Sequence, residues 1–304
     1  MGMTVTFGIN QIISHGFGLF LFAALVPLMQ AEVGITHWHL ATIGALTQLA
    51  YLGGAMMLGV IGHRIDSSRL MLTSGAVTSA LLFSMSHLND PMMMLIALTV
   101  MSASAAISWG AIVELVTRYG PPGRNATTLS TASSGTAWGY GLNGMLILLV
   151  VPAFGWRSGW LAAALLGLLT LSLTAWVLRR LARHHAHAVL DAAAPAVMST
   201  RTLFRTIVHE RTARYACLIC FLVGFSAMPF STWLNTWLAE LALPPALGGY
   251  AWSTIGISGM AAGFLIGKFA DRKGHGPALL VIFGGFAVCL MAFLPSSAVN
   301  RVSA

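Results

Sequence analysis

Nine apolar runs, each about as long as a membrane-spanning helix, are the feature that most limits how this chain can fold. A helix needs about 20 apolar residues to cross the ~30 Å hydrocarbon core of a bilayer. Strands of a membrane barrel would be about half as long and would alternate polar with apolar residues. The sequence therefore predicts an all-α polytopic membrane protein with spans at residues 8–29, 39–61, 70–88, 92–115, 126–151, 157–178, 214–238, 249–269 and 276–294.

The composition excludes a soluble globular fold. Charged residues make up only 8% of the 304 residues, whereas soluble proteins carry about 25%. Three cysteines are too few for a disulfide framework. The net charge of +8 could indicate nucleic-acid binding, but the basic residues lie between the apolar runs. We therefore expect a lipid bilayer as the partner and no nucleic acid.

The distribution of lysine and arginine predicts the orientation in the membrane. With the N-terminus in the cytoplasm, 14 of the 16 basic residues fall on the cytoplasmic side, and only Arg157 and Arg301 fall outside. Cytoplasmic loops of membrane proteins carry such an excess of positive charge. We expect a multi-pass protein of the cell inner membrane with a cytoplasmic N-terminus.

A repeated loop motif divides the chain into two units. The second run is followed by a loop segment that starts at Gly59, and the eighth by a similar one that starts at Gly267, 208 residues later. We expect a six-helix N-terminal bundle at 1–178, a basic cytoplasmic linker at 179–213 and three helices of a second bundle at 214–304. Parallel repeats of this kind are typical of transporters.

The second copy of the motif, Gly-x-x-x-Asp-Arg-x-Gly at residues 267–274, resembles the signature loop of the major facilitator superfamily. The basic linker and the Gly155-Trp156-Arg157 segment also resemble this family. In the first copy His63 replaces the aspartate and Asp66 replaces a glycine, so that copy is degenerate. The resemblance implies a secondary active transporter that moves a small organic solute by alternating access. It implies no cofactor, no metal and no enzymatic activity.

The family has six plus six spans, and this chain ends after the ninth predicted span. Three more spans would need on the order of 100 residues. We therefore expect a chain truncated relative to its family, and a monomer if the protein is full length. The alternative function is an inactive or partner-dependent fragment of such a transporter.

The resemblance also implies that the loop motifs act as cytoplasmic latches. Glu114 and Arg118 are spaced to form an ion pair one helical turn apart near the first motif. The candidate gate residues are Gly59, Arg64, Asp66, Glu114, Arg118, Gly267, Asp271, Arg272 and Gly274.

Polar and aromatic residues inside the spans are candidates for a solute cavity, because polar groups in hydrocarbon are costly. Gln11 and His15 share one face of the first span, and Gln48 and Tyr51 share one face of the second. The alternative role for such residues is hydrogen bonding between helices. The candidate cavity residues are Gln11, His15, Gln48, Tyr51, Trp109, Tyr140, Asn143, Trp233 and Asn235.

His15 is the one histidine, carboxylate, lysine or arginine deep inside a predicted span. If transport is coupled to protons, it is the best candidate carrier; a neutral structural histidine is the alternative. A membrane enzyme would need a nucleophile–base or metal pattern at this depth, and the sequence contains none that we recognise.

Two further patterns indicate packing rather than binding. Trp156 and Trp237 near span ends are typical of the aromatic belt at the membrane surface. Glycines spaced four apart, at 135 and 139 and at 259, 263 and 267, predict close helix contacts.

Overall fold

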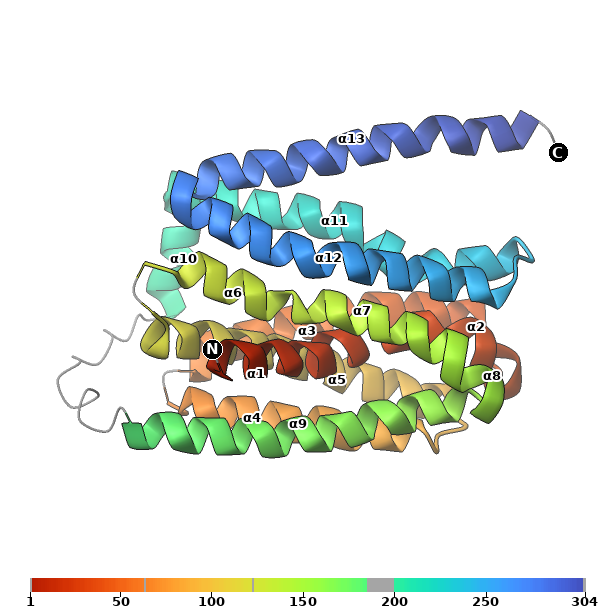
Figure 1. Cartoon of the computed structure of the whole chain (residues 1–304), viewed down its shortest axis with the longest axis horizontal. Helices are drawn as coiled ribbons and strands as arrows, with labels where there is room; N and C mark the ends of the chain where they lie inside the picture. The colour runs from red at the N-terminus through yellow and green to blue at the C-terminus, as the bar shows by residue number, and fades with distance from the viewer. Residues whose placement is uncertain (1, 63, 122, 185–199, 303–304) are drawn as a thin grey trace.

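The computed structural model describes residues 2–62, 64–121, 123–184 and 200–302, and the described residues contain helices and no β-strand (Figure 1). The all-α prediction is confirmed. In chain order the helices are α1 (Gly2–Gln11), η1 (Ile12–Phe17), α2 (Leu21–Val33), α3 (His37–Ile61), α4 (Ser67–Met85), α5 (Pro91–Tyr119), α6 (Asn125–Ser133), α7 (Gly135–Met145), η2 (Leu146–Val150), α8 (Val151–Phe154), α9 (Trp156–His184), α10 (Thr200–His209), α11 (Arg211–Glu240), α12 (Pro245–Lys273) and α13 (His275–Val302).

Seven helical segments of the described chain are long and apolar enough to cross a membrane. The segments are Gly2–Val33, His37–Ile61, Pro91–Tyr119, Asn125–Phe154, Trp156–Arg183, Arg211–Glu240 and Pro245–Lys273. The other two predicted spans, 70–88 and 276–294, fall on α4 and α13.

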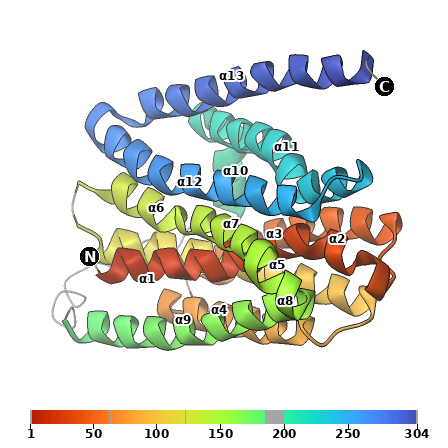
Figure 2. The ribbon, with the colours of Figure 1, turned by 45° about the vertical axis from the view of Figure 1, so that its right-hand side comes forward.

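The helices lie side by side with their axes roughly aligned, and helices of the second unit cover one side of the first (Figures 1 and 2). Within residues 2–184, α5 packs against α3 and α4, α4 packs against α9, and α1 packs against α6 and α9. The second unit meets the first along two lines: α12 lies on α6 and α7, and α11 lies on α2. Both contacts lie between residues 2–184, which we call the first unit, and residues 200–302, which we call the second unit.

The first and fifth predicted spans are interrupted, which the apolar pattern did not predict. The first span changes from α-helix to the π-helix η1 around His15 and breaks at Gly18–Phe20 before α2 begins. The fifth span is divided into α6, α7, η2 and α8. Pro152 is the second residue after η2, and a proline cannot donate the N–H of a regular helical turn, so the wider π turn accommodates it.

Local sequence signals mark several helix ends. Asp66 accepts from the backbone N–H of Ser68 and caps α4, and Asp90 caps α5 in the same way. Gly34, at φ +77°, ends α2 in the left-handed conformation that glycine tolerates best. The expected linker at 179–213 is partly helical, because α9 extends to His184 and α10 covers Thr200–His209. Residues 185–199 lie outside the described part of the chain.

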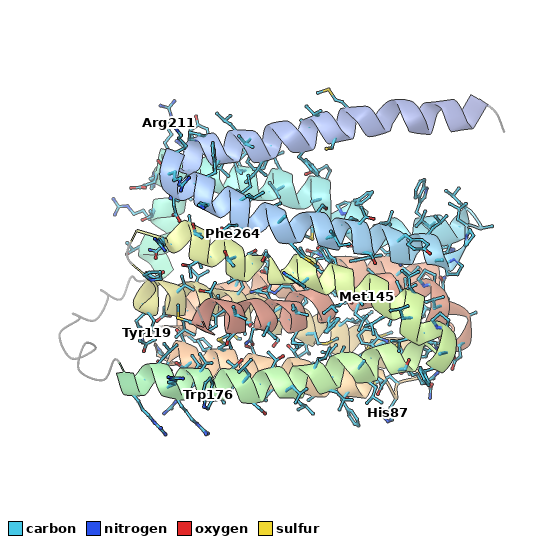
Figure 3. All side chains as sticks on the ribbon, viewed as in Figure 1. His87, Tyr119, Met145, Trp176, Arg211 and Phe264 are labelled. Carbon is cyan, nitrogen blue, oxygen red and sulfur yellow. The ribbon has the colours of Figure 1, made fainter. Side chains whose placement is uncertain are left out.

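The two ends of the bundle differ in charge. We call the end that carries Asp66 and Asp271 the motif end, and the end that carries Glu32 and Arg157 the far end. Figure 3 labels Tyr119 and Arg211 at the motif end and His87 at the far end. The predicted basic loops at 64–69, 118–124, 179–183, 205–214 and 268–273 all fall at the motif end.

Candidate functional site

The second motif joins the two units at the motif end. Asp271, in the last turn of α12, accepts hydrogen bonds from the backbone N–H groups of Ala126 (3.2 Å) and Thr127 (2.9 Å), and from the Thr127 hydroxyl. These N–H groups belong to the first turn of α6, where a helix has no partners of its own for them and carries partial positive charge. The carboxylate therefore holds the start of α6 to the end of α12.

The other residues of the second motif permit this close approach. A Cβ at Gly267 would lie 2.9 Å from the Thr127 Cα and 1.9 Å from the Ser130 Oγ, so any side chain there would push α12 from α6. Gly274 has a φ of +92° and ends α12. Arg272 is exposed at the same end.

In the first motif, in contrast, Asp66 contacts residues of its own unit. Arg118 pairs with Asp66 (Nη1–Oδ1, 3.6 Å) and with Glu114 (Nη2–Oε1, 2.7 Å), and Ser67 donates to Glu114. This network ties the loop before α4 to α5. Gly59 and Arg64 are exposed, and His63 lies outside the described residues.

A cavity of about 650 Å³ lies beside the contact between α12 and α6–α7. It brings together two of the predicted cavity residues, Trp109 of α5 and Tyr140 of α7. The wall between them carries hydroxyl groups, and the opposite wall is formed by glycines of α12 and by α13. The polar or aromatic lining residues are Trp109, Ser130, Ser133, Ser134, Thr136, Tyr140 and His275.

The serines of this wall were missed because single hydroxyls are common in membrane helices. Ser130 and Ser134 each donate to a backbone carbonyl of their own helix, at Ala126 and Thr131. Their spacing of four residues, the same as that of Gly263 and Gly267 opposite, was the available signal.

His15 and Tyr51 form a second polar pair. The His15 Nε2 lies 3.2 Å from the Tyr51 hydroxyl, the Nδ1 lies 3.0 Å from the Ser14 hydroxyl, and the His15 and Tyr51 rings meet edge to face. Both residues are half-buried, and neither lines the 650 Å³ cavity. Gln48 lies on α3 one turn before Tyr51 and is exposed.

Two predicted cavity residues instead lie between helices of the first unit. Asn143 is fully buried and donates to the carbonyl of Gly16 (2.9 Å), where the backbones of η1 and α7 cross. Gln11 is also buried, and it packs beside Gly135 of α7. The interhelical alternative describes both positions better than the cavity does.

The remaining two predicted cavity residues lie on α11 away from the cavity lining. Trp233 packs against Gly44 of α3. Asn235 is buried at the far end, donates to the carbonyl of Ala24 (2.7 Å) and accepts from the indole N–H of Trp252 (3.0 Å). Trp252 was not predicted as a site residue, because an apolar aromatic in a span carries no distinctive signal.

Trp156, which the sequence predicts to lie in the membrane-surface belt, bonds within the protein. It is buried at the far end, and its indole N–H donates to Glu32 (2.7 Å), which also accepts from Arg157. This cluster joins the end of α2 to the start of α9. The Gly155-Trp156-Arg157 segment therefore stabilises the first unit.

The chain belongs to the Major Facilitator Superfamily, because the sequence profile of that family matches residues 11–303. It is 22% identical to a gallate transporter of Pseudomonas putida, over 92% of this chain and 68% of that protein. It is 25% identical to a Streptomyces coelicolor protein named "Probable transporter SCO4007", over 90% of this chain and 62% of that protein. The nucleoside transporter NupG has the same fold, with a TM-score of 0.60 to 0.61 at 15% identity, over 90% of this chain and 69% of NupG.

The family and the apolar helices together define a multi-pass membrane transporter. The resemblance seen in the second motif is thus confirmed. The chain spans about two thirds of the length of the relatives it matches.

Proposed function

We propose that this protein is a secondary active transporter that moves a small organic solute across the cell inner membrane by alternating access, with its N-terminus in the cytoplasm. The observation that carries the proposal is the hydrogen-bonded contact between the units at the motif end. Asp271 is exposed and binds α6 through hydrogen bonds. Water can replace such bonds at small net cost, so the motif end can open and close.

The cavity chemistry favours an organic solute with ring character. Trp109 and Tyr140 offer aromatic faces, the serines offer hydroxyl oxygens, and the described lining contains no carboxylate, lysine or arginine. Small-molecule sites combine apolar and aromatic walls with a few polar groups in this way. The similarity to a gallate transporter and to a nucleoside transporter supports the same class of organic solute with ring character.

The pair of His15 and Tyr51 is our candidate for binding a coupling proton. A π turn within an α-helix often marks a functional site, and η1 is centred on His15. Among the helices packed against η1, one further titratable group, Tyr140 of α7, lies near the middle of its helix. The other titratable groups of these helices lie near helix ends. The charged residues of those elements are Glu32, Arg69, Glu114, Arg118, Arg157, Arg179, Arg180 and Arg183.

Uptake into proteoliposomes under an imposed pH gradient tests the proposal, with a panel of labelled ring-containing solutes. We expect at least one solute to accumulate against its gradient and to leave when the pH gradient is collapsed. In His15→Gln, which keeps a hydrogen-bonding group but cannot hold a proton at this pH, the solute should equilibrate without accumulating. If folded protein moves no solute in the panel, the inactive or partner-dependent alternative is the better description.

A further inference from the structure

We propose that Asn235 is the latch that holds the two units together at the far end, as the counterpart of Asp271 at the motif end. The inference rests on the proposed function, because alternating access requires the far end to open in turn. It assigns Asn235 to a gate rather than to the solute cavity.

Asn235 uses both ends of its amide group, one across the boundary between the units and one within the second unit. The nitrogen donates to the Ala24 carbonyl of α2 at 2.7 Å, and the oxygen accepts from the Trp252 indole of α12 at 3.0 Å. The side chain is 6% exposed. A single residue thus joins α11 and α12 of the second unit to α2 of the first.

The surroundings of the amide are shaped to fit it. A Cβ at Gly248 would lie 2.6 Å from the Asn235 Oδ1, so this glycine leaves the space that the amide fills. Next to the amide lies a cavity of about 220 Å³, lined by Leu28 of α2 and Leu238 of α11 among others. Opening of the latch would widen this space between the two units.

An aromatic cluster connects the latch to the solute cavity. The Trp252 ring that bonds Asn235 also packs edge to face on Tyr140, at 5.0 Å between centroids, and Tyr140 packs in the same way on Phe20, at 4.8 Å. Tyr140 lines the 650 Å³ cavity. A solute that displaces the Tyr140 ring would therefore act on the partner of Asn235.

The amide suits a buried latch better than a carboxylate would. Burial of a charged group in the membrane is costly unless it is paired, whereas a neutral amide needs only hydrogen bonds. Asp271, at the exposed motif end, has no such restriction.

The labelling rate of a reporter cysteine measures how readily the far end opens, and this measurement does not require transport. In a background with Cys217, Cys220 and Cys289 replaced by serine, Leu28→Cys is exposed to a maleimide added to both sides of membrane vesicles. We expect Asn235→Ala to raise the labelling rate about fivefold, the factor for the one hydrogen bond that it breaks across the boundary. Trp252→Phe should raise the rate by less, because it removes only the bond that orients the amide. Trp252→Phe deletes the N–H donor and keeps an aromatic ring.

Two controls separate opening from unfolding. Asn143→Ala removes a buried amide of the same kind within the first unit and should leave the labelling of the reporter unchanged. A second reporter, Ala163→Cys in the core of the first unit, should stay unlabelled in every variant.

Unchanged labelling in both Asn235→Ala and Trp252→Phe would overturn the latch, even if the wild type transports. Faster labelling in a protein that transports no solute would keep the latch and reject the proposed function. If Asn235→Ala fails to fold, the labelling rate of the reporter in Trp252→Phe alone tests the latch.

Discussion

The two copies of the loop motif occupy the same place in their repeats and make different contacts. In the second copy, Asp271 reaches across the boundary between units to the start of α6. In the first copy, Asp66 caps its own helix α4 and pairs with Arg118 of α5, so the contacts of this carboxylate stay inside one unit. The position of the carboxylate in the motif thus decides whether it stabilises one unit or joins two of them.

The glycines of the two copies show the same difference. Gly267 faces the backbone of α6 at a distance that leaves no room for a side chain, while a Cβ at Gly59 would meet no atom within 4 Å. Glycine is therefore required for packing at position 267, whereas position 59 has room for a side chain. Substitutions at matched positions can test this contrast.

The largest effect is expected at the glycines. Gly267→Ala should lower the free energy of unfolding by ~1–3 kcal/mol, because overpacking against the Thr127 backbone forces α12 and α6 apart. Gly59→Ala should raise it by up to ~1 kcal/mol, since alanine is the better helix former where space is open. Thermal unfolding of the purified variants in detergent measures both, and a loss at Gly59 equal to that at Gly267 would contradict the comparison.

The aspartates should give the next effect. Asp271→Asn loses the charge-assisted bonds to Ala126 and Thr127 and should raise the labelling rate of a Ser130→Cys reporter roughly tenfold, the factor for a charged hydrogen bond. Asp66→Asn should leave that rate unchanged, because asparagine caps α4 almost as well. Equal effects of the two substitutions on the reporter would show that the first copy also joins the units.

The smallest effect is expected at Arg118. Its pairs with Asp66 and Glu114 are more than one third exposed, and such surface pairs contribute ~0.2–1 kcal/mol. Arg118→Gln should lower the free energy of unfolding by that amount at low salt and by less at 1 M salt, because ions screen the pairs. A salt-independent loss would mean that packing of the arginine, rather than its charge, stabilises the loop.

Much of the fold could be predicted from the sequence because the signals are local. The length of an apolar run predicts a span regardless of which helices the span packs against. Asp66, Asp90 and Gly34 likewise determine only the helix ends next to them. The second motif was also recognisable, since its glycines and aspartate stand at fixed spacing. The interruptions at η1 and η2 were not, because helix hydrophobicity is unaffected by a change in helical turn.

The candidate site was predicted only in part. Trp109 and Tyr140 both line the 650 Å³ cavity, whereas Asn143 and Asn235 have the same side chain and meet different neighbours. A helical face tells which residues point the same way and does not tell which helix they meet. The hydroxyl wall of the cavity and Trp252 were missed because single hydroxyls and aromatic side chains are common in membrane helices.

The sequence by itself determined that this chain is a helical membrane protein of the Major Facilitator Superfamily, because periodicity, length and motif spacing are properties of the chain alone. Only the tertiary structure decided that Asp271 bonds α6, that Asn235 bonds α2 and that His15 meets Tyr51. Each of these contacts joins two different helices, so its partner depends on how the helices pack.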